Sequence, residues 1–176
     1  MAEWIEVAVK CGAILGGVFV VFQYLDSKQT ERVKTTLSYV QRFEDEKTQI
    51  YDAQRRVSSA LQLQIGNISR YAQSEMTEQQ SLDLRRDLET QILERANRKT
   101  KEGDDNIDVL MELDGFFYSL RVCVENNNCD LKIAVGFFRP YAVRLQQNFK
   151  LELAKRAREA PGFGRGLEWM ARGEAH

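Results

Sequence analysis

The segment Trp4–Leu25 reads WIEVAVKCGAILGGVFVVFQYL and decides how the rest of the chain is organised. Its run from Cys11 to Phe22 is apolar, with no polar face at any helical angle. As a helix, the stretch from Trp4 to Tyr24 would be about 31 Å long, close to the ~30 Å hydrocarbon thickness of a bilayer. The sequence therefore predicts a transmembrane anchor at the N-terminus.

The ends of this segment also suit a membrane anchor. Trp4 and Tyr24 fall where aromatic rings prefer the membrane boundary, and Lys10 is close enough to one end to extend its ammonium group outward. One alternative is a cleaved signal peptide, because the uncharged part is short for a span, and another is a buried soluble helix. Glu3 and Glu6 stand where a signal peptide would be basic, so we favour the anchor.

The basic residues around the segment predict its orientation. Lys28, Arg32 and Lys34 follow the segment closely, whereas Lys10 is the only basic side chain before the apolar run. The positive-inside rule places the more basic flank in the cytoplasm. We therefore expect a single-pass protein with its C-terminal body in the cytoplasm.

The cysteines outside the anchor are interpreted through this orientation. Cys123 and Cys129 flank the sequence VENNN and could close a small disulfide loop in an oxidising compartment. In the cytoplasm they would stay reduced and behave as small apolar residues. The predicted orientation therefore favours two free thiols.

Length and charge limit what the rest of the chain can be. Of the 176 residues, about 150 follow the anchor, which is enough for one helical domain. The net charge of −1 gives no electrostatic reason to expect nucleic-acid binding. We expect an all-α fold, divided into a transmembrane anchor (1–25), a cytoplasmic helical domain (26–160) and a C-terminal tail (161–176).

Apolar residues spaced by three and four positions predict the helices of the body. An amphipathic continuation of the anchor through residues 30–43 leads into an antiparallel bundle of about four helices. The first of these carries a heptad-like seam suited to a coiled coil, and Thr77 with Gln80 predicts a capping box for the second. Pro140 predicts a kink near Gly136–Pro140 in the last helix. The expected helices are Thr48–Tyr71, Glu78–Arg98, Ile107–Glu125 with a cap at Asp105 or Asn106, and a helix capped by Asp130 that runs to Arg158.

Two of these helices are expected to form an antiparallel hairpin across the asparagines at 126–128, because asparagine tolerates left-handed backbone. Apolar side chains cover more than half of the circumference of the first helix, so we expect it at the centre of the core. The predicted core of the hairpin consists of Phe116, Phe117, Phe137, Phe138 and Tyr141.

Three parts of the chain form a recognisable pattern: the anchor, the helix after it with Arg32, Tyr39, Arg42 and Phe43, and the stretch LMELDGFFYSLRVCVENNNCDLKIAVGFFRPYAVRLQQNF at 110–149. With this pattern the chain resembles a family of small bacterial single-span membrane proteins of unknown function. The resemblance implies an anchor, a helical cytoplasmic body and a bacterial membrane. It implies no reaction.

The sequence contains no convincing catalytic constellation. The only histidine, His176, is the last residue, which argues against histidine-based acid–base or zinc chemistry. The glycines at 162–166 lack the flanking residues of a phosphate-binding loop. Asp108, Glu112 and Asp114 could form a paired-carboxylate site, but we interpret them as a solvated helix face. We expect no enzymatic activity, no cofactor and no metal site.

These features predict a protein-interaction or oligomerisation module at the inner face of a bacterial membrane. The alternative is a membrane-active effector or a small channel-like oligomer, although the segment lacks the polar stripe that usually lines a pore. Gly12 and Gly16 form a GxxxG pair, which could let two spans approach closely but also arises by chance in membrane helices. The expected partners are membrane lipid, a second copy through the span and an unidentified protein, and not nucleic acid.

Overall fold

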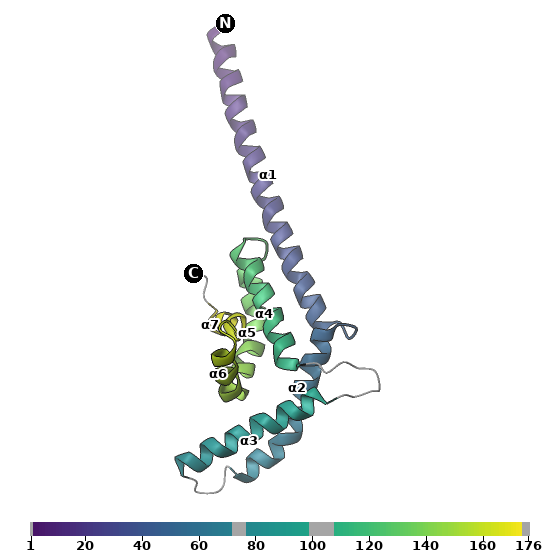
Figure 1. The fold of residues 1–176 in the computed structure, drawn as a ribbon. Helices are drawn as coiled ribbons and strands as arrows, with labels where there is room; N and C mark the ends of the chain where they lie inside the picture. The colour runs from purple at the N-terminus through teal and green to yellow at the C-terminus, as the bar shows by residue number, and fades with distance from the viewer. Residues whose placement is uncertain (1, 72–76, 99–107, 174–176) are drawn as a thin grey trace.

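The computed structural model describes residues 2–71, 77–98 and 108–173, and the side chains within 23–64, 77–98 and 108–173. Every regular element in these residues is an α-helix, which confirms the all-α prediction. The body is a helical bundle from which one long helix extends (Figure 1). The helices are α1 (Ala2–Glu44), α2 (Gln49–Tyr71), α3 (Glu78–Asn97), α4 (Val109–Glu125), α5 (Leu131–Asn148), α6 (Lys150–Glu159) and α7 (Arg165–Arg172).

The long helix is α1, whose 43 residues measure about 65 Å at 1.5 Å per residue. The side chains of residues 23–30 are all exposed, whereas Thr36 and Phe43 are buried in the body. Figure 1 shows the helix running on past the body toward the N-terminus. The helix expected through residues 30–43 is confirmed, and it joins the N-terminal segment to the core without a break.

The predicted membrane span is not established by the structure. Across the described residues, no helix is both long and apolar enough to cross a membrane. Trp4, Lys10, Gly12 and Gly16 lie outside the residues whose side chains are described. Tyr24, at the other end of the predicted span, is exposed.

Helices α2 and α3 lie side by side at the end of the body away from the N-terminus (Figure 1). The buried side chains of the two helices are small or branched and apolar: Ala53, Val57 and Ala60 in α2, and Ile92, Leu93 and Ala96 in α3. The predicted capping box at the start of α3 is confirmed. Thr77 accepts a hydrogen bond from the backbone N–H of Gln80, and the Gln80 side chain accepts one from the backbone N–H of Thr77.

Phe43 of α1 lies at the centre of the aromatic core. Its ring centroid is 5.0 Å from that of Tyr141, 5.3 Å from that of Phe116 and 5.4 Å from that of Phe138. Phe116 and Phe138 also contact each other across the hairpin, with centroids 5.3 Å apart. The hairpin aromatics therefore pack around a side chain from α1, and this attaches the long helix to the body.

The cap of α4 differs from the prediction. The Asp108 carboxylate accepts hydrogen bonds from the backbone N–H groups of Leu110 and Met111, at 3.1 and 3.2 Å. The assignment of this cap to Asp105 or Asn106 is therefore wrong, because Asp108 is the residue whose side chain reaches the free N–H groups of the first turn.

The predicted continuous helix from Asp130 to Arg158 is also wrong. The structure confirms Asp130 as the cap of α5, but α5 ends at Asn148 and a separate helix, α6, begins at Lys150. Phe149 separates them with φ −126° and ψ 32°, and its side chain is buried. Burial of this ring turns the chain where helical periodicity alone would have continued it.

Helix α7 packs against both α4 and α5 and belongs to the core. Leu167, Trp169 and Met170 are buried, although the sequence predicts only a C-terminal tail of no stated structure at 161–176. Gly166 makes the close approach possible. A Cβ atom added there would lie 2.3 Å from the backbone nitrogen of Tyr118, so only glycine fits without moving α4 or α7.

Candidate binding cleft

A cleft of about 880 Å³ lies between α1 and the C-terminal half of α4. Its α1 wall extends from Lys28 to Tyr39, and its opposite wall extends from Tyr118 to the turn at 126–128. A separate hollow of about 530 Å³ shares Ser119 with it and lies between α4, Arg42 of α1 and the start of α2 at Thr48–Ile50. The larger hollow, which Arg42 does not line, makes the α1–α4 face the candidate binding surface of the body.

Hydrogen bonds join α1 to the hairpin turn at one end of this cleft. The Nε atom of Arg32 donates to the carbonyl oxygen of Asn127 at 2.8 Å. The Nε2 atom of Gln29 donates to Oδ2 of Asp130 at 2.6 Å, and the Asp130 backbone N–H donates to Oγ1 of Thr36 at 2.7 Å. The turn is therefore held against α1 at three points.

A disulfide closes the same turn, which corrects the expectation of two free thiols. Cys123 and Cys129 are bonded, with Cα atoms 5.3 Å apart. Asn127 adopts φ 57°, and the backbone N–H groups of Asn128 and Cys129 donate to the carbonyl oxygen of Cys123 at 2.9 and 3.1 Å. This tight reversal brings the two cysteines within the range that a disulfide requires.

One stripe of α4 presents apolar surface beside the cleft. Met111, Tyr118 and Val122 are 60%, 53% and 37% exposed, and their spacing places them on one side of the helix. Gly115 lies between them with open space around its Cα position. The stripe combines exposed apolar side chains with a position where another backbone could come close.

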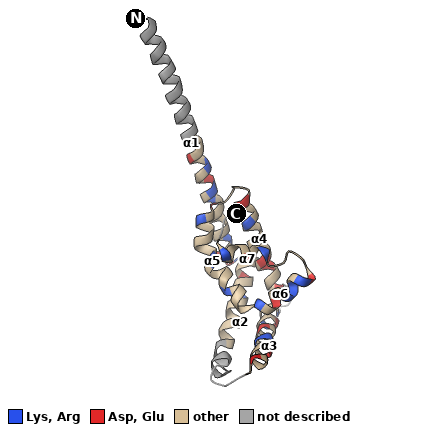
Figure 2. Ribbon diagram, turned by 90° about the vertical axis from the view of Figure 1, so that its left-hand side faces the viewer, with Lys and Arg blue, Asp and Glu red and all other residues tan. Residues whose placement is uncertain are grey.

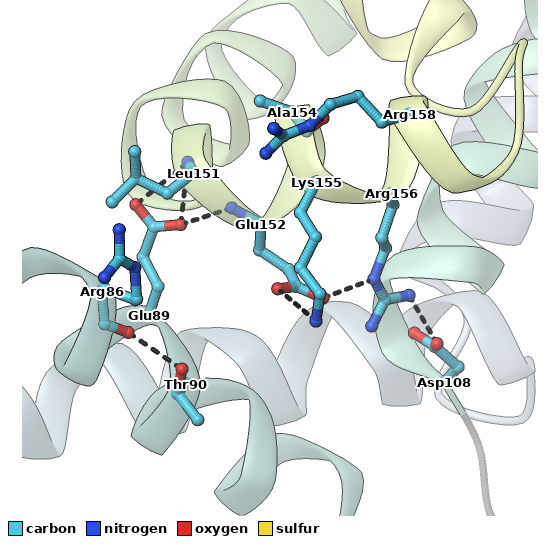
Figure 3. Close-up of polar contacts among 10 residues, drawn as sticks. All are labelled: Arg86, Glu89, Thr90, Asp108, Leu151, Glu152, Ala154, Lys155, Arg156 and Arg158. Carbon is cyan, nitrogen blue, oxygen red and sulfur yellow. Dashed lines mark hydrogen bonds and ion pairs between the residues drawn. The ribbon is translucent and has the colours of Figure 1, made fainter.

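Away from the cleft, Glu89 of α3 caps a helix that is distant in sequence. Its carboxylate accepts hydrogen bonds from the backbone N–H groups of Leu151 and Glu152, at 3.0 and 2.9 Å, and from Nε of Arg85 at 3.2 Å. Figure 3 shows the Glu89 side chain reaching the first turn of α6. Glu89 is only 3% exposed. Its carboxylate therefore obtains its hydrogen bonds from α6 and Arg85 instead of from water.

The three carboxylates interpreted as a solvated face of α4 have separate surroundings. Asp108 caps α4 and also pairs with Arg156 of α6 (Figure 3). Asp114 is partly buried beside α7, and its Oδ1 has no hydrogen-bond partner. Glu112 alone is exposed, so the solvated-face interpretation is wrong for the other two.

The surroundings of Asp114 change its acidity. Burial raises the pKa of the Asp114 carboxyl above its ordinary value of 3.8, and this effect outweighs the backbone N–H groups of Gly164 and Leu167, which lower it. Those N–H groups belong to the start of α7. Asp114 therefore lies beside the first turn of α7 in a place where its carboxylate is poorly solvated.

The five hairpin aromatics chosen from sequence lie together. Phe116, Phe117 and Phe138 are buried, and Phe137 and Tyr141 are partly buried with ring centroids 5.9 Å apart. They fill the core and do not line the 880 Å³ cleft.

No pattern in the sequence predicts this cleft or its lining residues. The sequence marks Arg32 only as part of the basic flank after the anchor and as one of the residues that carry the resemblance. Within the described ranges, no group of three or more His, Cys, Asp or Glu side chains is placed to hold a metal ion.

Comparison with known proteins adds no family to these observations. No protein-family model, curated protein or solved structure matches the chain. The resemblance to small single-span bacterial proteins therefore stays a prediction.

Proposed function

We propose that this chain is a membrane-anchored helical module that associates with a second copy of itself at the inner face of a bacterial membrane. In this proposal its role is binding, and it catalyses no reaction. The feature that carries the proposal is the course of α1. This one helix is buried in the body at Thr36 and Phe43, and it leaves the body with residues 23–30 exposed.

The part of α1 beyond the body contains the apolar run from Cys11 to Phe22. An apolar run of this length would present a large hydrophobic surface to water if nothing covered it. A bilayer would cover that surface, and the thickness of its hydrocarbon core matches the length of the predicted span. Lipid insertion is therefore the environment that best explains why an apolar helix projects from a polar body.

Anchoring would bring two copies together in the same orientation. At 100° per residue, Gly12 and Gly16 fall roughly opposite the face of α1 that Thr36 and Phe43 bury in the body. Two spans could then approach through Gly12 and Gly16 without a clash between the bodies. The exposed stripe of α4, with Met111 and Tyr118, supplies apolar surface for contact between the bodies.

The side of the membrane is the part of the proposal on which two observations disagree. Lys28, Arg32 and Lys34 follow the anchor and favour a cytoplasmic body. The disulfide between Cys123 and Cys129 favours an oxidising compartment, because disulfides are rare in the cytoplasm. We propose that the body is cytoplasmic. The redox state of Cys123 and Cys129 in the cell tests this side of the membrane.

Self-association is tested by crosslinking the full chain in membranes. Replacing Gly12 and Gly16 together by isoleucine keeps the segment apolar, so the protein should remain in the membrane fraction while the crosslinked dimer is lost. The double substitution Ala13→Ile and Val20→Ile serves as a control for added bulk. Equal dimer yields in the Gly12/Gly16 variant and the parent would exclude the span as the contact. Loss of the parent protein from alkali-washed membranes would exclude the anchor itself.

Orientation is tested with one introduced thiol, because the native pair can be blocked by the disulfide. Ser59 is exposed on α2, so Ser59→Cys in a chain with Cys123→Ser and Cys129→Ser provides a reactive site in the body. An impermeant maleimide should label it only after the membrane is opened. Labelling in intact cells, together with an oxidised native pair after acid trapping, would place the body on the other side.

A further inference from the structure

The end of the α1–α4 cleft nearest the predicted anchor has the chemistry of an anion site. Three basic residues of α1, Lys28, Arg32 and Lys34, line the cleft, and Glu31 is the one acidic residue among its lining residues. Figure 2 shows basic and acidic residues following one another along this part of α1. The lining therefore carries three positive charges and one negative charge.

Arg32 is held in place before any ligand arrives. Its Nε atom donates to the carbonyl oxygen of Asn127, which belongs to a turn held by the backbone N–H groups of Asn128 and Cys129 donating to the carbonyl oxygen of Cys123. Among the described residues, the two Nη groups of Arg32 have no partner. A guanidinium fixed through Nε presents its remaining N–H groups in the planar arrangement that binds phosphate oxygens in pairs.

The lysines increase the positive potential without competing for the same contacts. Lys34 is exposed and has no partner in the described part of the chain. Lys28 pairs with Glu31 at 3.6 Å, but both side chains are more than half exposed, so this pair is easily exchanged for a stronger anion. Lys28 also lies 5.9 Å from the ring of Tyr24, the residue placed at the membrane boundary.

Distance along α1 indicates where the anion would come from. Lys28 follows Tyr24 by one helical turn, about 6 Å, and Arg32 by about 12 Å. The headgroup layer adds roughly 5–8 Å on each side of the hydrocarbon core. Figure 1 shows the turn between α4 and α5 at the end of the body that faces the N-terminal part of α1. Lipid phosphate would therefore lie within reach of the cleft mouth.

We propose that this cleft binds the phosphate of an anionic phospholipid headgroup, with Arg32 as the paired donor and Lys28 and Lys34 as the surrounding charge. The inference rests on the proposed membrane anchor. It adds a function that anchoring alone does not require, namely a preference for anionic lipid. It also gives the Asn127 turn a role, since the turn fixes the guanidinium.

The test measures the lipid that remains bound to the full chain after extraction from nanodiscs containing phosphatidylcholine and phosphatidylglycerol in a ratio of 4:1. Native mass spectrometry should find phosphatidylglycerol on the parent protein well above its share of the bilayer. Arg32→Gln should lower that retention by about tenfold, as expected for the loss of charge-assisted hydrogen bonds. Lys34→Gln, which leaves the Asn127 contact intact, should lower it less.

Arg42→Gln is the matched control, because it removes the same charge from the same helix about 15 Å further from the predicted anchor. It should retain phosphatidylglycerol as the parent does. Equal retention by the parent and Arg32→Gln, or no preference over phosphatidylcholine in the parent, would overturn the headgroup site. Binding of inorganic phosphate alone through Arg32, without lipid preference, would also overturn it and would assign the cleft to a soluble anion. Failure of every variant to enter phosphatidylcholine nanodiscs would instead refute the anchor.

Discussion

The α4–α5 hairpin and the C-terminal pair α6–α7 begin their helices in different ways. Asp108 caps α4 and Asp130 caps α5, each accepting hydrogen bonds from N–H groups in the turn that follows it. Helices α6 and α7 have no side-chain cap at their N-cap residues, Phe149 and Gly164. The hairpin helices therefore begin with capping side chains of their own, and the helices of the C-terminal pair do not.

The first turns of α6 and α7 face carboxylates from helices earlier in the chain. Glu89 of α3 accepts hydrogen bonds from two N–H groups of α6, and Asp114 of α4 lies beside two N–H groups at the start of α7. A cap of this kind exists only after the body has assembled. The hairpin can therefore form helices from local signals, whereas α6 and α7 depend on tertiary contacts for their boundaries.

Truncation of the hairpin core should produce the largest effect. Phe138→Ala removes a fully buried ring that contacts Phe43, Phe116 and Phe117, so the free energy of unfolding should fall by about 3–5 kcal/mol. Thermal unfolding of the full chain in detergent, followed by circular dichroism, measures this change. Tyr118→Ala is the control, because its ring is 53% exposed and its loss should cost less than about 1 kcal/mol. Equal melting temperatures for the two variants would refute the aromatic core as the basis of the hairpin.

Removal of a remote cap should produce an intermediate and more local effect. Glu89→Gln replaces one acceptor oxygen with an amide that faces the N–H groups of Leu151 and Glu152, which should cost about 1–3 kcal/mol. Hydrogen exchange should accelerate in α6 while α4 and α5 stay protected. Glu94→Gln changes an exposed residue of the same helix and should leave exchange unchanged. Uniform acceleration across all helices would show that Glu89 supports the whole core and not α6 in particular.

The sequence predicts the locally encoded parts of the fold well. The Thr77–Gln80 capping box, the Asp130 cap and the helical register of α2 to α4 follow from spacing and cap chemistry, because those signals act within one turn of the chain. The break at Phe149 could not be predicted in this way. It depends on burial of Phe149 against other helices and on a carboxylate about 60 residues earlier.

The cleft, like the break at Phe149, depends on contacts between residues that are far apart in the sequence. The sequence places Arg32 in the basic flank of the anchor and in the family resemblance, but no spacing rule connects it to Asn127, its partner 95 positions away. Glu89 did carry a signal that could have been used, since a carboxylate next to Leu88 and three residues before Ile92 is unusual on an apolar face. A charged residue placed within an apolar stripe indicates a buried partner, although the sequence does not identify that partner.

The smallest expected effect concerns Asp114, the remote carboxylate beside α7. Because burial raises the pKa of Asp114 in the folded chain, its contribution to stability is complete below pH 3.8 and is lost as the pH rises through the raised value. Above that raised pKa the folded state holds a charge that it solvates poorly.

Asp114→Asn removes that charge and keeps an oxygen acceptor for the N–H groups of Gly164 and Leu167. The variant should melt no lower than the parent at pH 7, and the difference should stay within about 2–4 °C, which corresponds to roughly 1 kcal/mol in a chain of this size. Melting curves between pH 3 and pH 8 should show the two proteins converging as the pH falls. Glu112→Gln, an exposed change on the same helix, should show no such trend. A lower melting temperature for Asp114→Asn at neutral pH would mean that α7 gains more from a charged cap than the buried carboxylate costs. The two remote carboxylates would then stabilise the C-terminal pair in the same way.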